Sequence, residues 1–252
     1  MIDPSVDYQK INDYIYDEEW SKLWQIHFAN RPSTPHTVNM LAELVGDDDA
    51  LELGVGSGRV ALPLAQKCRN VWGIDTSPWM LTELKKQDSQ SRVVTVQTSA
   101  VDFDLEKKDF QLIFFISWGL AILLSDREKE ACFQQVSKHL KPSGLFVVET
   151  IHPEGYPFSS GNISTLKIDC ASVILGGEIH KPADRIVLNN MLFIEDNKKP
   201  RVHTSASHYC ATADLDEMAR RQGLELVAAY SDWTKNPLQD SHASMIRVYR
   251  KS

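Results

Sequence analysis

The chain has 252 residues, of which 42% are hydrophobic and 24% charged, and its formal net charge is −7 at pH 7. A chain of this size and composition folds into a globular protein with a substantial core, which excludes a fibrous or low-complexity protein. Acidic and basic residues are interspersed, so no basic stripe is present to neutralise the phosphates of a nucleic acid. We therefore expect a small-molecule substrate, no nucleic-acid partner, and a monomer or homodimer.

The sequence contains no pattern that predicts export or membrane insertion. Its start is polar and acidic rather than a secretory signal, and no apolar run approaches the ~18 residues that span a bilayer. The four cysteines are far apart and form no C-x-x-C pair, which predicts buried free thiols in a reducing compartment and no metal site. These features predict a cytoplasmic protein.

The first 45 residues predict an amphipathic helical segment. Apolar residues recur at helical spacing over residues 8–15 and 20–28. Pro32 and Pro35 then interrupt the pattern, and a further helix is expected over residues 37–45. We expect this segment to act as a lid or to pack against a sheet.

From residue 50 the pattern changes to short apolar strands that alternate with helices. Strands are expected over residues 50–53, 71–75, 93–97, 110–116 and 145–149, and helices over 60–67, 78–85 and 126–140. Ser77 and Asp126 are the expected N-caps of the last two helices, and the sequence Pro142-Ser143-Gly144 is expected to end the third helix. This alternation predicts a doubly wound, mostly parallel α/β sheet of Rossmann-like type.

The alternation breaks after residue 152. Residues 168–175, 185–195 and 203–208 have the period-two pattern of strands, with turns expected at Gly176-Gly177 and over residues 197–200. These segments predict an antiparallel insert. A helix over 214–222 and strands over 224–230 and 244–250, the latter as a hairpin at the sheet edge, complete the expected elements.

We predict a single domain over residues 1–252 with three parts. Its parts are a helical lid over 1–45, a core for a cofactor over 46–152 and 211–252, and the antiparallel insert over 153–210.

The turn after the first predicted strand reads E-L-G-V-G-S-G over residues 52–58. Glycine lets the backbone turn sharply and lets a ligand approach closely, as a nucleotide-like cofactor requires. A dinucleotide site needs G-x-G-x-x-G, and the position of its third glycine holds Arg59. The spacing therefore disfavours a nicotinamide cofactor.

The pattern E-x-G-x-G-x-G resembles motif I of the class I S-adenosylmethionine-dependent methyltransferases. Residues 71–81 (VWGIDTSPWML) resemble the second motif of that family, whose strand-terminal acid binds the ribose. Residues 98–105, 110–116 and 140–150 match the later motifs in order and spacing. The resemblance covers roughly residues 38–150, with a continuation at 214–250. It implies a seven-stranded methyltransferase sheet and S-adenosylmethionine as the cofactor.

The resemblance also implies roles for individual residues around the cofactor. Glu52 and the backbone of Gly54, Gly56 and Gly58 would approach its methionine portion. Asp75 would accept hydrogen bonds from both ribose hydroxyls, which a carboxylate can do with its two oxygens. A strand-end aspartate can also be a simple cap and the glycines a packing turn, but the ordered set of motifs favours a cofactor site.

The adenine end of the cofactor is less well matched. Thr76 and Met80 would flank the sugar and the adenine. The family often has an aspartate where this chain has Ser99. The hydroxyl of Ser99, the backbone of Ala100 or the nearby Asp102 would then supply the contact to the adenine amino group.

Residues that face the substrate should lie where the strands end. Ile116 is expected beside the cofactor, followed by Ser117 and Trp118 toward the substrate, with Tyr14 from the lid. The Asn/Asp-Pro-Pro-aromatic motif of nucleic-acid amino-methyltransferases is absent there, which argues against base methylation. His152 follows the fifth strand and could take a proton from an amine or hydroxyl, or could hydrogen-bond the loop.

Other aromatic and histidine side chains allow two interpretations. Trp20 and Trp24 could belong to a lid over the site or could be core against the sheet. His203, His208 and Tyr209 alternate with polar residues in the insert, which favours solvent-facing positions over a pocket wall.

The expected function is methyl transfer from S-adenosylmethionine to a small metabolite. Nitrogen is favoured over oxygen, because an amine lone pair attacks without obligatory base catalysis. The position of the insert is similar to that of small-molecule N-methyltransferases acting on amino sugars and related metabolites. Two alternatives remain: a catalytically silent S-adenosylmethionine-binding partner of another enzyme, and a nicotinamide oxidoreductase, which Arg59 disfavours.

Overall fold

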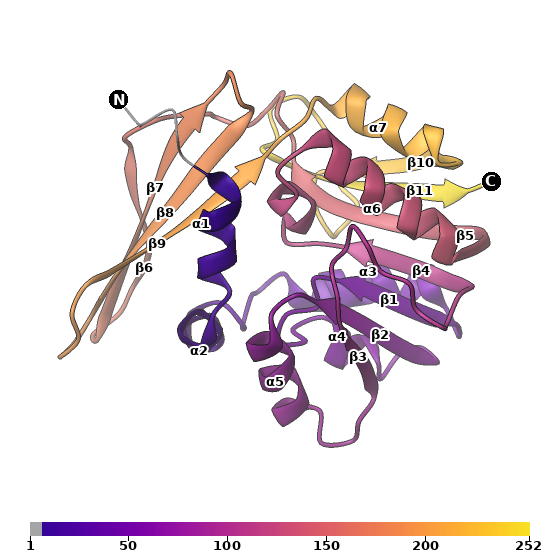
Figure 1. Cartoon of the computed structure of the whole chain (residues 1–252), viewed down its shortest axis with the longest axis horizontal. Coiled ribbons are helices and arrows are strands. Elements are labelled where there is room, and N and C mark those ends of the chain that lie inside the picture. The colour runs from indigo at the N-terminus through magenta and orange to yellow at the C-terminus, as the bar shows by residue number, and fades with distance from the viewer. Residues whose placement is uncertain (1–6) are drawn as a thin grey trace.

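A seven-stranded, mostly parallel sheet forms the centre of the protein (Figure 1). The computed structural model describes residues 7–252, apart from the side chains of Tyr14 and Ile15. The strands of this sheet are β1 (Asp49–Leu53), β2 (Asn70–Asp75), β3 (Val93–Gln97), β4 (Phe110–Phe115), β5 (Leu140–Ile151), β10 (Leu224–Tyr230) and β11 (Ser244–Lys251). Their order is β10-β11-β5-β4-β1-β2-β3. Strands β1 to β5 pair in parallel, whereas β11 is antiparallel to both of its neighbours.

Helices cover both faces of this sheet. They are α3 (Thr34–Val45), α4 (Ala61–Leu64), α5 (Pro78–Gln87), α6 (Asp126–His139) and α7 (Thr212–Arg221), with a 3₁₀ turn, η1 (Gly119–Ile122), after β4. In β4, Leu112 and Phe114 pack with α3, α4 and α5, whereas Ile113 and Phe115 pack with α6 and α7. The continuous apolar run of this strand therefore follows from burial on both of its faces.

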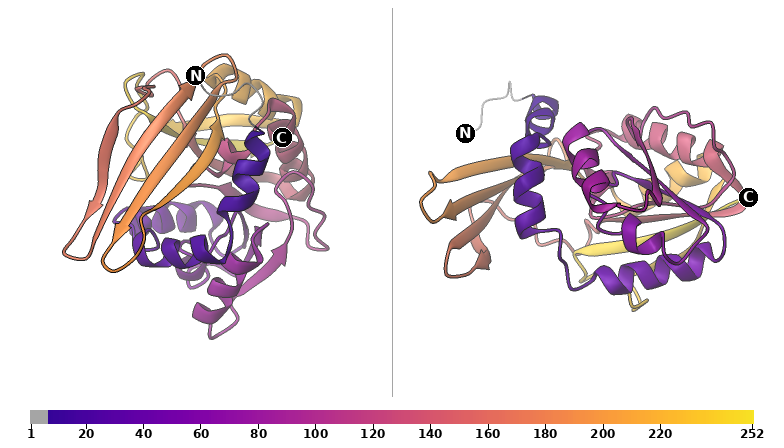
Figure 2. Two further views of the ribbon diagram at one scale, coloured as in Figure 1. Left: turned by 60° about the vertical axis from the view of Figure 1, so that its left-hand side comes forward. Right: turned by 90° about the horizontal axis from the view of Figure 1, so that it is seen from below.

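A second, antiparallel sheet lies beside the first, with the N-terminal helices next to it (Figures 1 and 2). It consists of β6 (Ile163–Ile168), β7 (Ser172–Lys181), β8 (Ile186–Glu195) and β9 (Arg201–His208), in that order. The helices are α1 (Tyr8–Ile15) and α2 (Glu18–His27). Trp20 of α2 packs with Phe193 of the second sheet and with Met80 of α5, so this helix joins the two parts.

Helix α1 covers the free edge of the second sheet at β9. The buried side chain of Asn12 donates a hydrogen bond to the carbonyl of Ala206 (3.0 Å) and accepts one from its N–H (2.9 Å). The amide thus replaces the neighbouring strand that an edge strand lacks, and it satisfies both backbone groups of one residue.

The predicted order of strands and helices in the core is confirmed, and β3 and β10 have the predicted bounds. The predicted helix over 60–67 is wrong in length. Only Ala61–Leu64 is α-helical, because the N–H groups of Gln66 and Lys67 bond three residues back, which tightens the chain into turns.

Two predictions around α6 are also wrong. Ser125 rather than Asp126 caps the helix, since its hydroxyl accepts a hydrogen bond from the N–H of Glu128 (3.3 Å). Residues 142–144 lie inside β5, which begins at Leu140 and pairs there with Phe110 before the register shifts.

The insert is antiparallel as predicted, but it contains four strands instead of three. Gly176 and Gly177 lie within β7 rather than in a turn, and a Cβ on Gly176 would approach the side chain of Leu166 to 2.8 Å. The turn lies at Asp169, whose carboxylate accepts hydrogen bonds from the N–H groups of Ala171 (2.9 Å) and Ser172 (2.8 Å).

All four cysteines are free, as predicted, but only Cys132 and Cys210 are buried, whereas Cys68 is half-buried and Cys170 is exposed. Over residues 7–252, no helix combines the length and the apolar character that crossing a membrane requires.

We expect Asn12→Ala to lower the free energy of unfolding by about 1–3 kcal/mol, because it leaves the buried backbone groups of Ala206 without partners. Urea denaturation and hydrogen exchange at the Ala206 amide would measure the loss. Asp13→Ala is the matched control, since Asp13 is the exposed neighbour on the same helix. Equal stability of the two variants would contradict a stabilising role for the Asn12 amide.

Candidate active site

A cavity of about 350 Å³ lies where β1, β2 and β4 end, with walls from the core, from α2 and from the second sheet. Most of the residues predicted to bind cofactor or substrate come together there: Glu52, Gly54, Gly56, Asp75, Thr76, Met80, Ser99, Ala100, Ile116, Ser117 and Trp118. Gly58, Asp102 and His152 are not in its wall, and the side chain of Tyr14 lies outside the described part of the chain. The roles of these residues toward a cofactor stay predictions.

The three glycines of the turn after β1 differ in what surrounds them. All have positive φ, at 64° for Gly54, 54° for Gly56 and 85° for Gly58. A Cβ on Gly56 would meet no atom within 4 Å, so this glycine leaves open space beside the backbone. A Cβ on Gly58 would approach the side chains of Leu62 and Leu84 to about 3 Å. Gly58 is therefore required for packing, whereas Gly56 leaves room for a ligand.

Asp75 ends β2 and holds two turns together. One carboxylate oxygen accepts a hydrogen bond from the N–H of Gly56 (2.8 Å), and the other accepts one from the N–H of Ser77 (2.8 Å). Burial raises the pKa of Asp75 above its ordinary value, and these hydrogen bonds oppose the shift. Each oxygen keeps a lone pair for a further donor in the cavity, so the carboxylate fits a pair of ribose hydroxyls.

Glu52 is a buried acid with an incomplete set of hydrogen bonds. The residue is only 4% exposed, and its Oε2 has no hydrogen-bond partner among the described residues. Burial raises the pKa of Glu52 to about 8, although the charge of Arg59 opposes the shift. A buried acceptor at a cavity wall fits an ammonium group, such as that of the methionine portion of S-adenosylmethionine.

Two arginines that the sequence did not single out as binding residues line the same cavity. Arg59 donates hydrogen bonds to the hydroxyls of Thr34 (2.9 Å) and Ser117 (2.7 Å). The guanidinium of Arg31 lies 5.1 Å from the ring centre of Trp24 and forms no ion pair within residues 7–252. Burial, with the nearby charge of Arg59, lowers the pKa of Arg31. A carboxylate, such as that of the methionine portion, would complete this arrangement.

The segment after β4 has a strained backbone. Ser117 and Trp118 have φ values of 56° and 60°, a left-handed conformation that is unfavourable for residues other than glycine. Glu149 accepts a hydrogen bond from the N–H of Ser117 (2.6 Å), and the indole N–H of Trp118 donates one to Ser244 (3.2 Å). These contacts hold the side chains of Ser117 and Trp118 at the cavity wall.

The second sheet supplies a further part of the cavity wall. Asn189 and Met191 of β8 and His203 and Ser205 of β9 line it. The prediction that His203 faces solvent is therefore wrong. Period-two alternation defines two faces of a strand, but the face that lies against α2 is determined by tertiary packing.

His208 and Tyr209, which the sequence pattern grouped with His203, do not line the cavity. His208 is buried, with Nδ1 2.9 Å from the Nζ of Lys129. The hydroxyl of Tyr209 lies 2.7 Å from the Nε2 of His180. His208 therefore joins the insert to α6, whereas Tyr209 joins two segments within the insert.

His152 is buried away from the cavity, which disagrees with its predicted role as a base. Its Nδ1 lies 2.7 Å from the carbonyl of His242, and its Nε2 lies 3.4 Å from Glu154. Its backbone N–H donates a hydrogen bond to Ala243 (3.0 Å), because β5 continues alongside β11 to this point. The contacts of His152 are those of a residue that orders the loop.

Asp102, one of three proposed adenine contacts, is exposed outside the cavity, whereas Ser99 and Ala100 line it. The hydroxyl of Ser99 accepts a hydrogen bond from the N–H of Val101 (3.3 Å).

Comparison with known proteins agrees with this arrangement. A family model described as a methyltransferase domain matches residues 50–144. The CcbJ methyltransferase from Streptomyces caelestis is 29% identical, with a TM-score of 0.83 over 88% of this chain and 90% of that one. S-adenosylmethionine-bound CalS10, an amino pentose methyltransferase from Micromonospora echinaspora, has the same fold, with 16% identity and a TM-score of 0.71 over 88% and 93% of the two chains.

A curated relative, an uncharacterized methyltransferase of Schizosaccharomyces pombe, is 25% identical over 134 residues. This alignment covers 53% of the present chain and 52% of the relative, so the chain spans about half the length of that protein. The chain therefore has the fold of the class I S-adenosylmethionine-dependent methyltransferases, and residues 50–144 of its core match a methyltransferase domain.

We expect Asp75→Asn to weaken binding of S-adenosylhomocysteine by roughly 10- to 150-fold, because hydrogen bonds to a charged acceptor are worth about 1.5–3 kcal/mol. Asp102→Asn is the control and should bind with unchanged affinity, since Asp102 lies outside the cavity. Calorimetry would measure both affinities. Asp75 would be a purely structural residue if its variant melted at a lower temperature but bound as tightly as the wild-type protein.

The raised pKa of Glu52 predicts a pH-dependent stability. Because its pKa rises from 4.5 to about 8 on folding, its protonated form stabilises the ligand-free fold fully below about pH 4.5. This contribution falls as the pH rises to about 8, by up to about 1.4 kcal/mol per pH unit. Glu52→Gln should not show this loss of stability. Urea denaturation across this pH range would measure the free energy of unfolding of both proteins. The same dependence on pH for both would contradict the prediction.

Proposed function

We propose that the protein transfers a methyl group from S-adenosylmethionine to the nitrogen of a small, hydroxyl-bearing metabolite. The observation that carries the proposal is that one cavity is lined both by the core residues predicted to bind the cofactor and by polar side chains of the second sheet. In this proposal the chain works as one domain, with the helices of residues 7–45 as a lid and residues 153–210 as the insert that contacts the acceptor.

The core residues hold the cofactor in this proposal. Asp75 accepts the ribose hydroxyls, Glu52 accepts the ammonium group, and Arg31 with Arg59 faces the methionine carboxylate. When bound, S-adenosylmethionine supplies a methyl group on a positively charged sulfur, which is already electrophilic. The main task of the surrounding residues is then to align the acceptor and exclude water.

The side chains of the second sheet favour a polar substrate as the acceptor of the methyl group. Asn189, Ser205 and Ser207 place an amide and two hydroxyls in the cavity wall, which can donate to and accept from the hydroxyls of a ligand. Trp20 and Trp24 supply aromatic faces beside them, and such faces attract an ammonium group. An acceptor with both an amine and hydroxyls, such as an amino sugar, matches this combination. The amino pentose activity ascribed to CalS10 supports the same class.

We expect transfer of labelled methyl from S-adenosylmethionine to at least one member of a panel of amino sugars and aliphatic amino alcohols. The matched control replaces each amine by the corresponding hydroxyl compound, for example glucose in place of glucosamine, and should accept no label. Scintillation counting and mass spectrometry of the product would measure the transfer. Transfer to the hydroxyl compounds alone would contradict the preference for nitrogen. Binding of S-adenosylhomocysteine without transfer to any amine would favour a catalytically silent protein.

A further inference from the structure

His203 is held in the cavity wall by packing alone. Its ring centre lies 5.2 Å from that of Trp20 and 5.4 Å from that of Phe193, which meets it edge-on. Neither ring nitrogen forms a hydrogen bond to any residue that the structure describes. The imidazole is therefore fixed in position, and its polar atoms remain available to a ligand in the cavity.

The other acidic or basic groups of the cavity are poorly suited to accept a proton. Burial raises the pKa of Tyr16 far above neutrality, so its hydroxyl stays protonated. The oxygens of Asp75 accept hydrogen bonds from two backbone N–H groups, and in the proposed function their remaining lone pairs accept the ribose hydroxyls. Glu52, whose pKa is about 8, is protonated at neutral pH until a cation approaches it. Arg31 and Arg59 have no lone pair to offer. His203 alone among these groups combines a free lone pair with a neutral side chain at pH 7.

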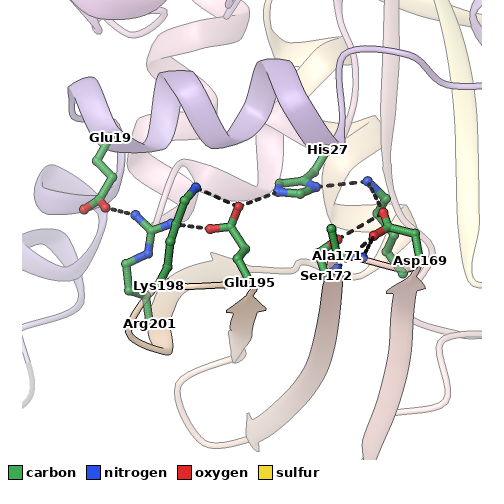
Figure 3. Close-up of polar contacts among 9 residues, drawn as sticks. Glu19, His27, Asp169, Ala171, Ser172, Glu195, Lys198 and Arg201 are labelled. Carbon is green, nitrogen blue, oxygen red and sulfur yellow. Dashed lines mark hydrogen bonds and ion pairs between the residues drawn. The ribbon is translucent and has the colours of Figure 1, made fainter.

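The charged groups around His203 leave its imidazole neutral. Burial lowers the pKa of His203, Asp17 before α2 opposes the shift, and Arg201 on the same strand adds to it. The charge of Arg201 is offset, because its guanidinium pairs with Glu195 of β8 (2.5 Å) and with Glu19 of α2 (Figure 3). The effect of burial therefore dominates.

The same ion pairs determine where His203 lies. Arg201 is two residues from His203 in β9, so both side chains point to the same face of the strand. The contact of Arg201 with Glu19 joins this face to α2, and Glu195 also lies 3.7 Å from His27 of that helix (Figure 3). These contacts keep β9 against α2 and His203 beside Trp20.

We infer that His203 is the proton acceptor in methyl transfer, an inference that rests on the proposed N-methylation. An amine of ordinary basicity arrives as an ammonium ion, which has no lone pair. A ring nitrogen of His203 takes one N–H proton, and the electron pair of that bond remains on the amine nitrogen. This pair then forms the bond to the methyl carbon while the bond from carbon to sulfur breaks, and its electrons stay on sulfur. The imidazolium afterwards releases its proton to water.

Base catalysis by His203 predicts a particular pH profile for His203→Gln, which keeps polarity but cannot take up a proton. The wild-type protein and the variant are compared on the most basic amine of the panel that the wild-type protein methylates. At pH 7 the variant should have a kcat/KM lower by roughly 10²- to 10⁴-fold, the usual contribution of a general base. The difference should disappear as the pH rises above the pKa of the amine. Affinity for S-adenosylhomocysteine should be unchanged.

His36→Gln is the matched control, since His36 is an exposed histidine on α3, and this variant should retain the wild-type profile. Added imidazole should restore activity to His203→Ala at pH 7. A His203→Gln profile that equals the wild-type profile at every pH would overturn the role of His203 while leaving N-methylation intact. An equal loss of kcat/KM at all pH values would also overturn it, because that loss would indicate a purely structural residue. Failure of the wild-type protein to methylate any amine would instead overturn the proposed function.

Discussion

The carboxylate of Asp75 is the contact on which the geometry of the cavity depends. It binds the N–H of Gly56 from the turn after β1 and the N–H of Ser77 at the start of α5. Ser77 in turn donates its hydroxyl proton to the carbonyl of Tyr16, between α1 and α2 (2.7 Å). One acid at the end of β2 thereby links the glycine turn, the next helix and the segment between α1 and α2. A buried carboxylate without these donors would be costly, so the two turns are held in shape before any ligand binds.

The cavity also contains groups whose placement costs stability in the ligand-free protein. Glu52 is buried with one oxygen unpaired, Arg31 forms no ion pair with the described residues, and Ser117 with Trp118 has a left-handed backbone. Each of these features is unfavourable on its own, and they share one cavity wall. A ligand with an ammonium and a carboxylate group on one carbon would neutralise the first two together. The unfavourable features and the fold therefore point to the same cofactor.

The sequence allowed the core to be predicted well because its signals are local. Strand periodicity, the turn at Gly54 and Gly56, and the acid that ends β2 are each defined within a few residues. The sequence could not show that Gly56 leaves open space whereas Gly58 is needed for packing. That difference depends on Leu62 and Leu84, which fill the space beside the backbone of Gly58. Arg31 and His203 belong to no motif, and both line the cavity only because the segment after α2 and the second sheet pack around it. Such contacts follow from tertiary packing.

The contacts of the insert explain why the motifs identify the cofactor and leave the acceptor open. Strands β8 and β9 are joined to α1 by the Asn12 amide and to α2 by the ion pairs of Arg201, and they form a sheet separate from that of the core. Side chains such as Asn189 and His203 can therefore change without disturbing Asp75 or the glycine turn. In the proposed function, specificity for the acceptor and affinity for the cofactor depend on different hydrogen bonds in different sheets, so substitutions in one set should be additive with substitutions in the other.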